Sequence, residues 1–490
     1  MLEYLKKHRY PVVFWIIFLL HFSITYYGVI VYRYQVAPGD DTLAHLQMAE
    51  VFRHKPTFWP SSGYPPGFHY LILGLGSIFH ATPSHVLALI WPLFIVLGGL
   101  AVYYFARKAF DVKTALVAYV LFALVCPQPL QTAYDGGWPN IIATGIFLPI
   151  SLVFWTKLWQ RFRLWDLAIF LLTGVLIIYT HHLSTVMWLA ILLVSGTVMV
   201  VAKAIHGSSW RRFILPVVWL VGAIVMYLLF TRTEILGAAK TLMNFGLSNN
   251  DSPVWPIKTY LSSLSGIVFQ LALIGLIIAA WKIIRVERMG AKSNYLIVLA
   301  SWFMVYFIIS RLPVAEPGRA ARDLALPASV LAALTLVIIL NKVRGDRVVW
   351  VSLIVASAFV MSVSFYLKTA SQLKYNSMVR FSKADTEALS FINNSGGPYP
   401  YLVWPKNGFW SIEAKTEIDN GRVKLATPGG LNEVAAGKTC GLLGYYKPGI
   451  WQEFLQDRSI LDYYLARPDL KVSYLVEDST KIWYLLCKKQ

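Results

Sequence analysis

The sequence predicts an α-helical membrane protein that crosses the bilayer about eleven times and ends in a small extracytoplasmic α/β domain. The composition is 57% hydrophobic and only 14% charged, whereas soluble proteins are about a quarter charged. Residues 1–369 hold 42 charged side chains (29 Lys+Arg, 13 Asp+Glu), and residues 370–490 hold 27 (15 and 12), about 11% against about 22%. We therefore divide the chain into a membrane domain, 1–369, and a C-terminal domain, 370–490.

Each predicted span is an apolar run long enough to cross about 30 Å of hydrocarbon. The first run, Pro11 to Tyr32, follows Lys6, Lys7 and Arg9 and is too long for the apolar core of a signal peptide. It is therefore an uncleaved span. The other ten are 84–106, 112–128, 139–157, 164–180, 184–204, 213–231, 257–282, 293–311, 322–341 and 346–367.

The distribution of basic residues sets the predicted topology. The apolar stretch from Gly67 to His80 has only 14 residues and follows Pro65-Pro66, so we interpret it as an interfacial or re-entrant helix. With eleven spans, the cytoplasmic segments hold 19 of the 29 Lys+Arg and the outer segments hold 10. This bias predicts a plasma (inner) membrane protein with a cytoplasmic N-terminus and the C-terminal domain outside.

The charge pattern also excludes two classes of function. The net charge of +19 is spread between apolar runs and is not gathered on one face, which argues against a nucleic-acid partner. The spans are almost free of ionisable residues, whereas ion-coupled transporters place such residues near the midplane. The polar chemistry lies in the outer loops instead.

The densest signal lies in the loop 33–83. Pro38-Gly39-Asp40-Asp41 predicts a helix start with one of the two acids as the N-cap, and Leu43, Leu46, Ala49 and Phe52 would line one side of an interfacial helix. Capping alone would explain the acids. However, His45 follows Asp41 by four residues on the same face, and a carboxylate near an apolar boundary is a candidate general base.

These motifs resemble those of the GT-C superfamily, the membrane glycosyltransferases that use polyprenyl-phosphate-linked sugars. Asp40-Asp41, then Tyr64-Pro65-Pro66 and then the second span follow that family's order over about residues 1–160. The resemblance implies a GT-C-like membrane domain, a polyprenyl-phosphate-linked sugar as donor and an extracytoplasmic acceptor. The Trp-Trp-Asp-Tyr-Gly motif of oligosaccharyltransferases is absent from the C-terminal domain, which argues against transfer of whole oligosaccharides to asparagine.

Two further outer segments supply candidate substrate-binding residues. Asp135 precedes Gly136-Gly137-Trp138, where the acid could bind sugar hydroxyls and the ring could cover a sugar face. A plain turn and a membrane-interface tryptophan explain the same residues. His181 and His182 end a span and are candidates for hydrogen bonds to sugar or phosphate. The alternative is that they are ordinary polar residues at the membrane interface. Adjacent histidines do not suit one metal ion, so we predict no metal site.

Arg319 and Arg322 lie in the predicted outer loop near residues 311–323, where basic residues break the positive-inside trend. They lie one helical turn apart, and arginine suits phosphate oxygens, so we predict that they bind the donor phosphate. The alternatives are a pair between Arg322 and Glu316, or snorkelling into the lipid headgroups.

The C-terminal domain is predicted to hold a helix from the capping box at Ser382 through Ile392, and a second near Trp451 to Leu465. It has no catalytic motif, and both acceptor binding and lid-like support remain open. Cys440 and Cys487 could form a disulfide in an oxidising compartment. The predicted strands are Tyr399–Trp404, Val423–Ala426, Val472–Glu477 and Ile482–Leu486, the last two paired across Asp478-Ser479-Thr480.

The prediction for function is transfer of a sugar with inversion, with Asp40 as general base and Asp41 orienting the acceptor or His45. No cofactor is obligatory in this reaction, because arginines can stabilise a phosphate leaving group. The alternative is a non-catalytic component of lipid or polysaccharide export or assembly, which would tolerate loss of both acids.

Overall fold

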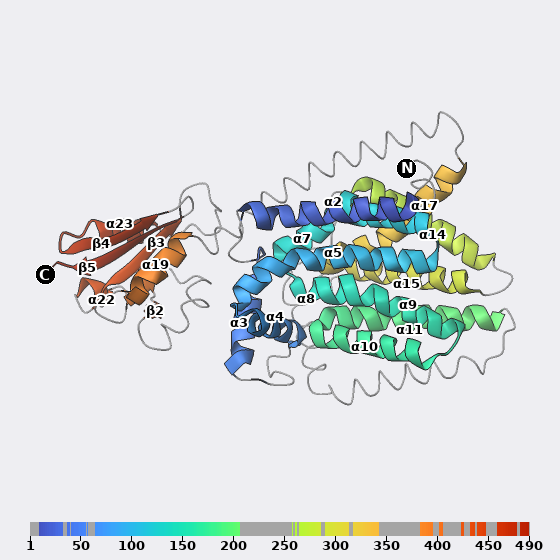
Figure 1. Cartoon of the computed structure of the whole chain (residues 1–490), viewed down its shortest axis with the longest axis horizontal. Helices are drawn as coiled ribbons and strands as arrows, with labels where there is room; N and C mark the ends of the chain where they lie inside the picture. The colour runs from blue at the N-terminus through green and yellow to red at the C-terminus, as the bar shows by residue number, and fades with distance from the viewer. Residues whose placement is uncertain are drawn as a thin grey trace.

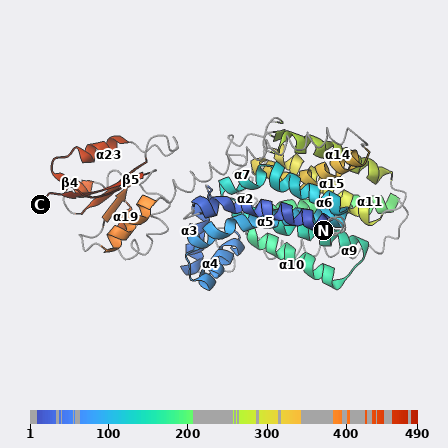
Figure 2. The ribbon, with the colours of Figure 1, turned by 45° about the horizontal axis from the view of Figure 1, so that its top comes forward.

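The computed structural model describes residues 9–32, 37–39, 41–54, 56, 64–205, 257, 260–261, 264–285, 290–312, 317–342, 383–394, 401–404, 423–425, 432–436, 439–446, 458–477 and 481–489. In this part of the chain, long helices form a bundle, and a smaller domain with a β-sheet lies beyond one end of it (Figure 1). Figures 1 and 2 both place the sheet beyond the end at which α3 (Thr42–His54) and α4 (Gly67–Phe79) lie.

The bundle is built from the described helices between residues 9 and 342. In addition to α3 and α4, its elements are α2 (Arg9–Tyr32), α5 (Pro83–Ala109), α6 (Val112–Val120), η1 (Leu121–Val125), α7 (Gln128–Asp135), α8 (Trp138–Asn140), η2 (Ile141–Phe147), α9 (Leu148–Gln160), α10 (Leu164–Thr180), α11 (His182–Ile205), α14 (Gly266–Ile284), α15 (Ala291–Ser310), α16 (Pro317–Asp323) and α17 (Ala325–Lys342).

The prediction of a multi-pass membrane protein is confirmed. Among the described residues, seven helices are long and apolar enough to cross a membrane, and Val112–Val125 and Leu164–Thr180 are shorter apolar helices on two other predicted spans. The predicted spans 213–231 and 346–367 lie outside the described residues, so the total of eleven stays a prediction.

The predicted span 112–128 ends early, at Val125. Cys126 has extended backbone angles and precedes Pro127. The proline ring disfavours helical angles in the residue before it, so the chain leaves the helix there and starts α7.

The two helices of the first outer loop agree with the sequence pattern. In α3, the predicted apolar side is buried at Leu46, Ala49 and Phe52, which are 1%, 0% and 3% exposed. Helix α4 has 13 residues, about 20 Å at 1.5 Å per residue, which is too short to cross the hydrocarbon.

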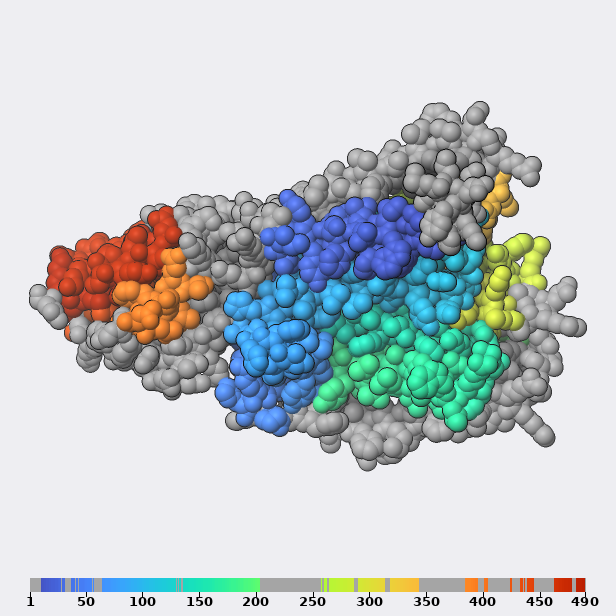
Figure 3. Space-filling view, in the orientation of Figure 1, coloured from blue at the N-terminus to red at the C-terminus, as the bar shows by residue number. Residues whose placement is uncertain are grey.

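Helices α15 and α17 are among the most buried helices of the bundle. In the most apolar window of each candidate span, 78% of the residues are buried for Gly318–Lys342 and 17% for Tyr10–Tyr27. The space-filling view accordingly shows α2 along the outside of the bundle (Figure 3). Helix α14 lies against α17 at Gly275, where a Cβ atom would stand 2.3 Å from the Leu331 carbonyl oxygen. Only glycine allows this approach.

The C-terminal domain has a five-stranded sheet in the order β2-β1-β3-β5-β4, in which β1 pairs in parallel with β2 and β3, and β5 pairs antiparallel with β3 and β4. The predicted α/β character is confirmed, including the β4–β5 hairpin. Strand β3 is not predicted from the sequence, because Gly441-Leu-Leu-Gly-Tyr-Tyr carries two glycines and no alternation. The elements are α19 (Lys383–Asn394), β1 (Tyr401–Trp404), β2 (Val423–Leu425), α22 (Asn432–Ala435), β3 (Gly441–Tyr446), α23 (Arg458–Leu465), β4 (Leu470–Glu477) and β5 (Lys481–Lys488).

A disulfide joins Cys440 and Cys487. Gly441 pairs with Leu486 in the β3–β5 ladder, so the two cysteines stand opposite each other at the end of that ladder. The bond therefore fixes the central strand that the sequence analysis missed.

The topology can be tested with single cysteines placed at Asn420 and Gln160. Because the basic residues are biased toward one side, we expect a membrane-impermeant maleimide to label position 420 from outside and position 160 only after permeabilisation. Labelling of both positions from the same side would show that the predicted topology is wrong.

Candidate functional site

Two loops that are predicted to lie outside the membrane, 33–83 and 127–139, are joined through their backbones. The Asp41 N–H donates to the Asp135 carbonyl at 2.8 Å. Gly39 and Gly136 have φ angles of +111° and +77°, and a Cβ on Gly39 would lie 2.2 Å from the Gly136 Cα. Both positions therefore require glycine, for conformation and for space. This contact brings Asp41 and Asp135, 94 residues apart in the sequence, to one place.

Trp138 strengthens the same junction. Its ring is fully buried, and its Nε1–H donates to Thr42 Oγ1 at 2.8 Å, while the Thr42 hydroxyl donates to the Pro38 carbonyl at 2.6 Å. We predicted that Trp138 covers a sugar face. In the structure the ring packs near Trp91, with 5.7 Å between ring centroids, and holds the start of α3.

Two arginines of α16 meet the two loop acids. Arg319 Nη2 lies 3.0 Å from Asp41 Oδ2, and Arg322 Nη1 forms an ion pair with Asp135 Oδ2. Because the arginines are one helical turn apart, each reaches the acid of a different loop. Asp41 was expected to face His45, but the structure shows its carboxylate on Arg319. Asp40 and Glu316 lie outside the described residues.

A buried polar network continues from α16 into the bundle. Asn140 Nδ2 donates to both carboxylate oxygens of Asp323, at 3.0 Å each. Thr144 Oγ1 and Ser184 Oγ donate to Asn140 Oδ1, each at 3.0 Å. Ser184 Oγ also lies 2.7 Å from His181 Nδ1. His181 is thus connected to Asp323 through side chains from three helices.

Four histidines surround Tyr64 beside this network. The Tyr64 ring centroid lies 5.3 to 6.4 Å from those of His45, His69, His181 and His182. His45 Nδ1 lies 3.3 Å from His69 Nε2. Burial lowers the pKa of His45 well below its usual value, and the neighbouring charges of His69 and Arg319 lower it further. Burial also lowers the pKa of His69 to about 4, partly offset by a hydrogen bond to the Pro65 carbonyl. Both rings are therefore neutral at pH 7.

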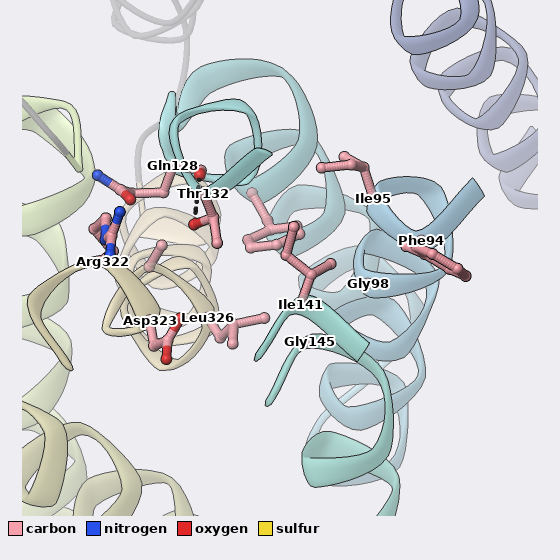
Figure 4. A pocket seen from close by; sticks show the side chains of 12 residues that line it. Phe94, Ile95, Gly98, Gln128, Thr132, Ile141, Gly145, Arg322, Asp323 and Leu326 are labelled. Carbon is pink, nitrogen blue, oxygen red and sulfur yellow. Dashed lines mark hydrogen bonds between the residues drawn. The ribbon is translucent and has the colours of Figure 1, made fainter. Parts of the chain in front are cut away.

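An apolar cleft opens next to the arginine pairs. Arg322 and Asp323 line it on the α16 side, and Ile95 and Gly98 of α5 lie opposite (Figure 4). The remaining lining residues are Phe94, Phe122, Gln128, Thr132, Ile141, Gly145, Ala325 and Leu326. The cleft is thus mainly hydrocarbon-lined, with a guanidinium at its polar end.

The structure gathers most of the predicted site residues. Asp41, Asp135, Arg319 and Arg322 form the ion pairs, and His45, His181 and His182 lie in the histidine group. The sequence analysis missed Tyr64, His69, Asn140 and Asp323 as site residues. One available signal was the four-residue spacing of Asn140 and Thr144, which puts two polar side chains on one face of an apolar run.

The described residues contain no group of three His, Cys, Asp or Glu side chains arranged to hold a metal ion. The expectation of a site without a metal ion stays a prediction, since Asp40 lies outside the described residues.

Comparison with known proteins shows the fold. The chain is similar to ArnT from Cupriavidus metallidurans bound to undecaprenyl phosphate, with 14% identity, coverage of 95% of this chain and 97% of that one, and a TM-score of 0.55. It is also similar to AglB, the oligosaccharyltransferase of Archaeoglobus fulgidus, in complex with an inhibitory peptide and a dolichol-phosphate, with 16% identity, coverage of 84% and a TM-score of 0.51. The match spans 64% of that AglB chain. No family model and no curated protein matches the sequence.

Both similar proteins are GT-C membrane glycosyltransferases, and the matches extend over most of this chain. The GT-C-like fold expected from the outer-loop motifs is therefore confirmed.

The neutral histidines predict that the outer loop loses stability in acid. A folded-state pKa below the unfolded value of 6.5 contributes stability above pH 6.5, which is lost as the pH falls toward the folded value. For His69 the loss between pH 7 and pH 5 is about 2 kcal/mol. We expect the melting temperature of the purified protein to fall over this range, and to fall less in His69→Gln. His54→Gln, at the exposed end of α3, is the matched control. An equal fall in all three proteins would contradict the assignment.

Proposed function

We propose that this chain, which has the GT-C fold, transfers a sugar from a polyprenyl-phosphate donor to an extracytoplasmic glycan, lipid or protein acceptor, with inversion at the anomeric carbon. The observation that carries the proposal is the position of Arg322, which lines the apolar cleft and pairs with an outer-loop acid. A guanidinium beside apolar side chains suits a phosphate group that is carried by a lipid.

The proteins of similar fold support this donor class. One of them holds undecaprenyl phosphate and the other dolichol-phosphate. For this chain, we place the donor phosphate at Arg319 and Arg322. The isoprenoid chain would lead away into the surrounding lipid, because the cleft beside Arg322 has a volume of only about 40 Å³.

The loop acids and the donor phosphate share the same arginines. An arginine has five N–H donors, so one guanidinium can bind a carboxylate and a phosphate oxygen together. Donor phosphate would take over part of Arg319 and weaken its contact with Asp41. Asp41 would then orient the acceptor hydroxyl, and His45, His181 and His182 would bond to hydroxyls of the sugar or the acceptor.

The reaction is a single displacement. The acceptor oxygen attacks the anomeric carbon and gives its proton to the Asp40 carboxylate, while the bond from that carbon to the phosphate oxygen breaks. The phosphate leaves with the bonding electron pair and is stabilised by Arg319 and Arg322. We keep Asp40 as the base because the carboxylate of Asp41 is already paired with Arg319.

The function itself can be tested by mass spectrometry of lipids and glycans in a strain that lacks the protein. We expect a polyprenyl-phosphate sugar to accumulate and one sugar to be missing from an envelope product. Re-expression of the parent chain should restore both, and the Asp40→Asn, Asp41→Asn double variant should not. Restoration by that variant would favour the export or assembly role.

If Arg319 and Arg322 bind the donor phosphate, their replacement by lysine should lower turnover. Arg322→Lys and Arg319→Lys keep the charge but lose the two-pronged contact, so we expect donor turnover to weaken by about 1 to 3 kcal/mol. The measurement is sugar transfer by the purified variants at saturating acceptor. Arg311→Lys, at the exposed end of α15, is the control for a general effect of the substitution. Unchanged turnover in both α16 variants would leave these arginines without a role in binding phosphate.

The proposed role of Asp40 as general base predicts the effect of its replacement on the rate, and the single displacement predicts the configuration of the product. Asp40→Asn keeps the shape but removes the proton acceptor, so the transfer rate should fall by about 10²- to 10⁴-fold. NMR of the product should show the anomeric configuration opposite to that of the donor. Parental rates in both Asp40→Asn and Asp41→Asn, or retention of configuration, would rule out this mechanism.

A further inference from the structure

We infer that a cavity at the other end of the bundle binds one anionic phospholipid, with the headgroup phosphate at Lys113 and an acyl chain between α2, α6 and α17. The cavity has a volume of about 450 Å³, within the range of ligand sites in proteins. This inference does not rest on the proposed sugar transfer.

The cavity lies between α2 and α17, and α6 closes its third side. Helices α2 and α17 each pack against α6. The lining comes from all three, and consists of Tyr10, Val13, Lys113, Leu116, Val117, Val337, Leu340 and Asn341. Every lining residue belongs to the described part of the chain.

Each helix contributes a polar residue at its end and an apolar residue about one turn deeper. Helix α2 begins at Arg9 and lines the cavity with Tyr10 and then Val13. Helix α6 begins at Val112 and contributes Lys113 and then Leu116.

Helix α17 ends at Lys342 and contributes Asn341, with Val337 one turn deeper. The three helices thus give the cavity a polar rim and an apolar interior. A phospholipid has the same arrangement, with a polar headgroup above an acyl chain.

Lys113 is the one charged residue among the described residues that line the cavity, and further basic residues stand at the ends of nearby helices. Lys113 and Lys342 are exposed, and Arg107 and Lys108 end the neighbouring helix α5. The acid on the connector to α6, Asp111, caps that helix by accepting the Thr114 N–H at 2.8 Å. Basic pockets between membrane helices favour anionic headgroups, and the net charge here favours an anionic over a zwitterionic lipid.

The surroundings favour a lipid over a soluble ligand. Tyr10–Tyr27 and Gly318–Lys342 are both candidate membrane spans, so the groove between them opens toward hydrocarbon. Helix α17 separates this cavity from the arginine site. Its 18 residues extend about 27 Å, with Asp323 just before its start and Asn341 near its end. One donor phosphate could not occupy both places.

The test is native mass spectrometry of the full-length protein, purified in detergent and supplied with phosphatidylglycerol, phosphatidylcholine or undecaprenyl phosphate. We expect one tightly bound phosphatidylglycerol per chain, retained in preference to phosphatidylcholine, whereas undecaprenyl phosphate should bind at the arginine site and be retained equally by the parent and Lys113→Ala. Lys113→Ala should weaken its retention about fivefold, which is the effect of one lysine near an anionic lipid surface. Val13→Trp should fill the groove and reduce retention of the same lipid.

Lys292→Ala is the matched control, because Lys292 is exposed at the start of α15, outside the cavity lining. Equal loss in Lys113→Ala and Lys292→Ala would show a general charge effect and overturn the inference. Equal retention of phosphatidylcholine would also overturn it, as would a loss of undecaprenyl phosphate in Lys113→Ala as large as the loss of phosphatidylglycerol. Val13 is substantially exposed, so the tryptophan variant tests the groove without opening the core.

Discussion

The ion pairs between α16 and the two outer loops are the constraint on which the site depends. Arg319 holds Asp41 from the first loop, and Arg322 holds Asp135 from the second. All four side chains are partly shielded from water, which strengthens their attraction relative to a fully exposed pair. The main effect of these pairs is on the positions of the side chains, because they bring three distant segments of the chain to one place.

The interior behind these pairs is polar for a related reason. Asp323 follows Arg322 directly and is buried at the end of α16, where a carboxylate needs hydrogen-bond donors. Asn140 supplies them, and its own carbonyl oxygen is satisfied by Thr144 and Ser184. The network therefore links the orientation of α16 to that of η2 and α11. A substitution of Asn140 would therefore change the position of Asp323 and, with it, that of the adjacent Arg322.

The two ends of the bundle differ in chemistry. At one end, cations are paired with acids and bordered by neutral histidines, which suits recognition of a charged group and of hydroxyls. At the other end, the exposed Lys113 lines a mainly apolar cavity, which suits a lipid headgroup and its acyl chain. A helix bundle can carry two such sites because its spans are almost free of ionisable residues between them.

The sequence by itself determined the membrane class, most of the span positions and the chemical importance of the outer loops. Length, apolarity and charge bias are properties of local segments, so they can be read without a structure. It also identified Asp41, Asp135, Arg319 and Arg322 as candidates. Only the tertiary structure decided that these residues pair across 94 to 278 positions of the chain, that Trp138 is buried, and that His69 lies on His45. Such contacts depend on how loops and helices approach one another. Two glycines, Gly39 and Gly136, permit that approach, and no local pattern specifies their partners.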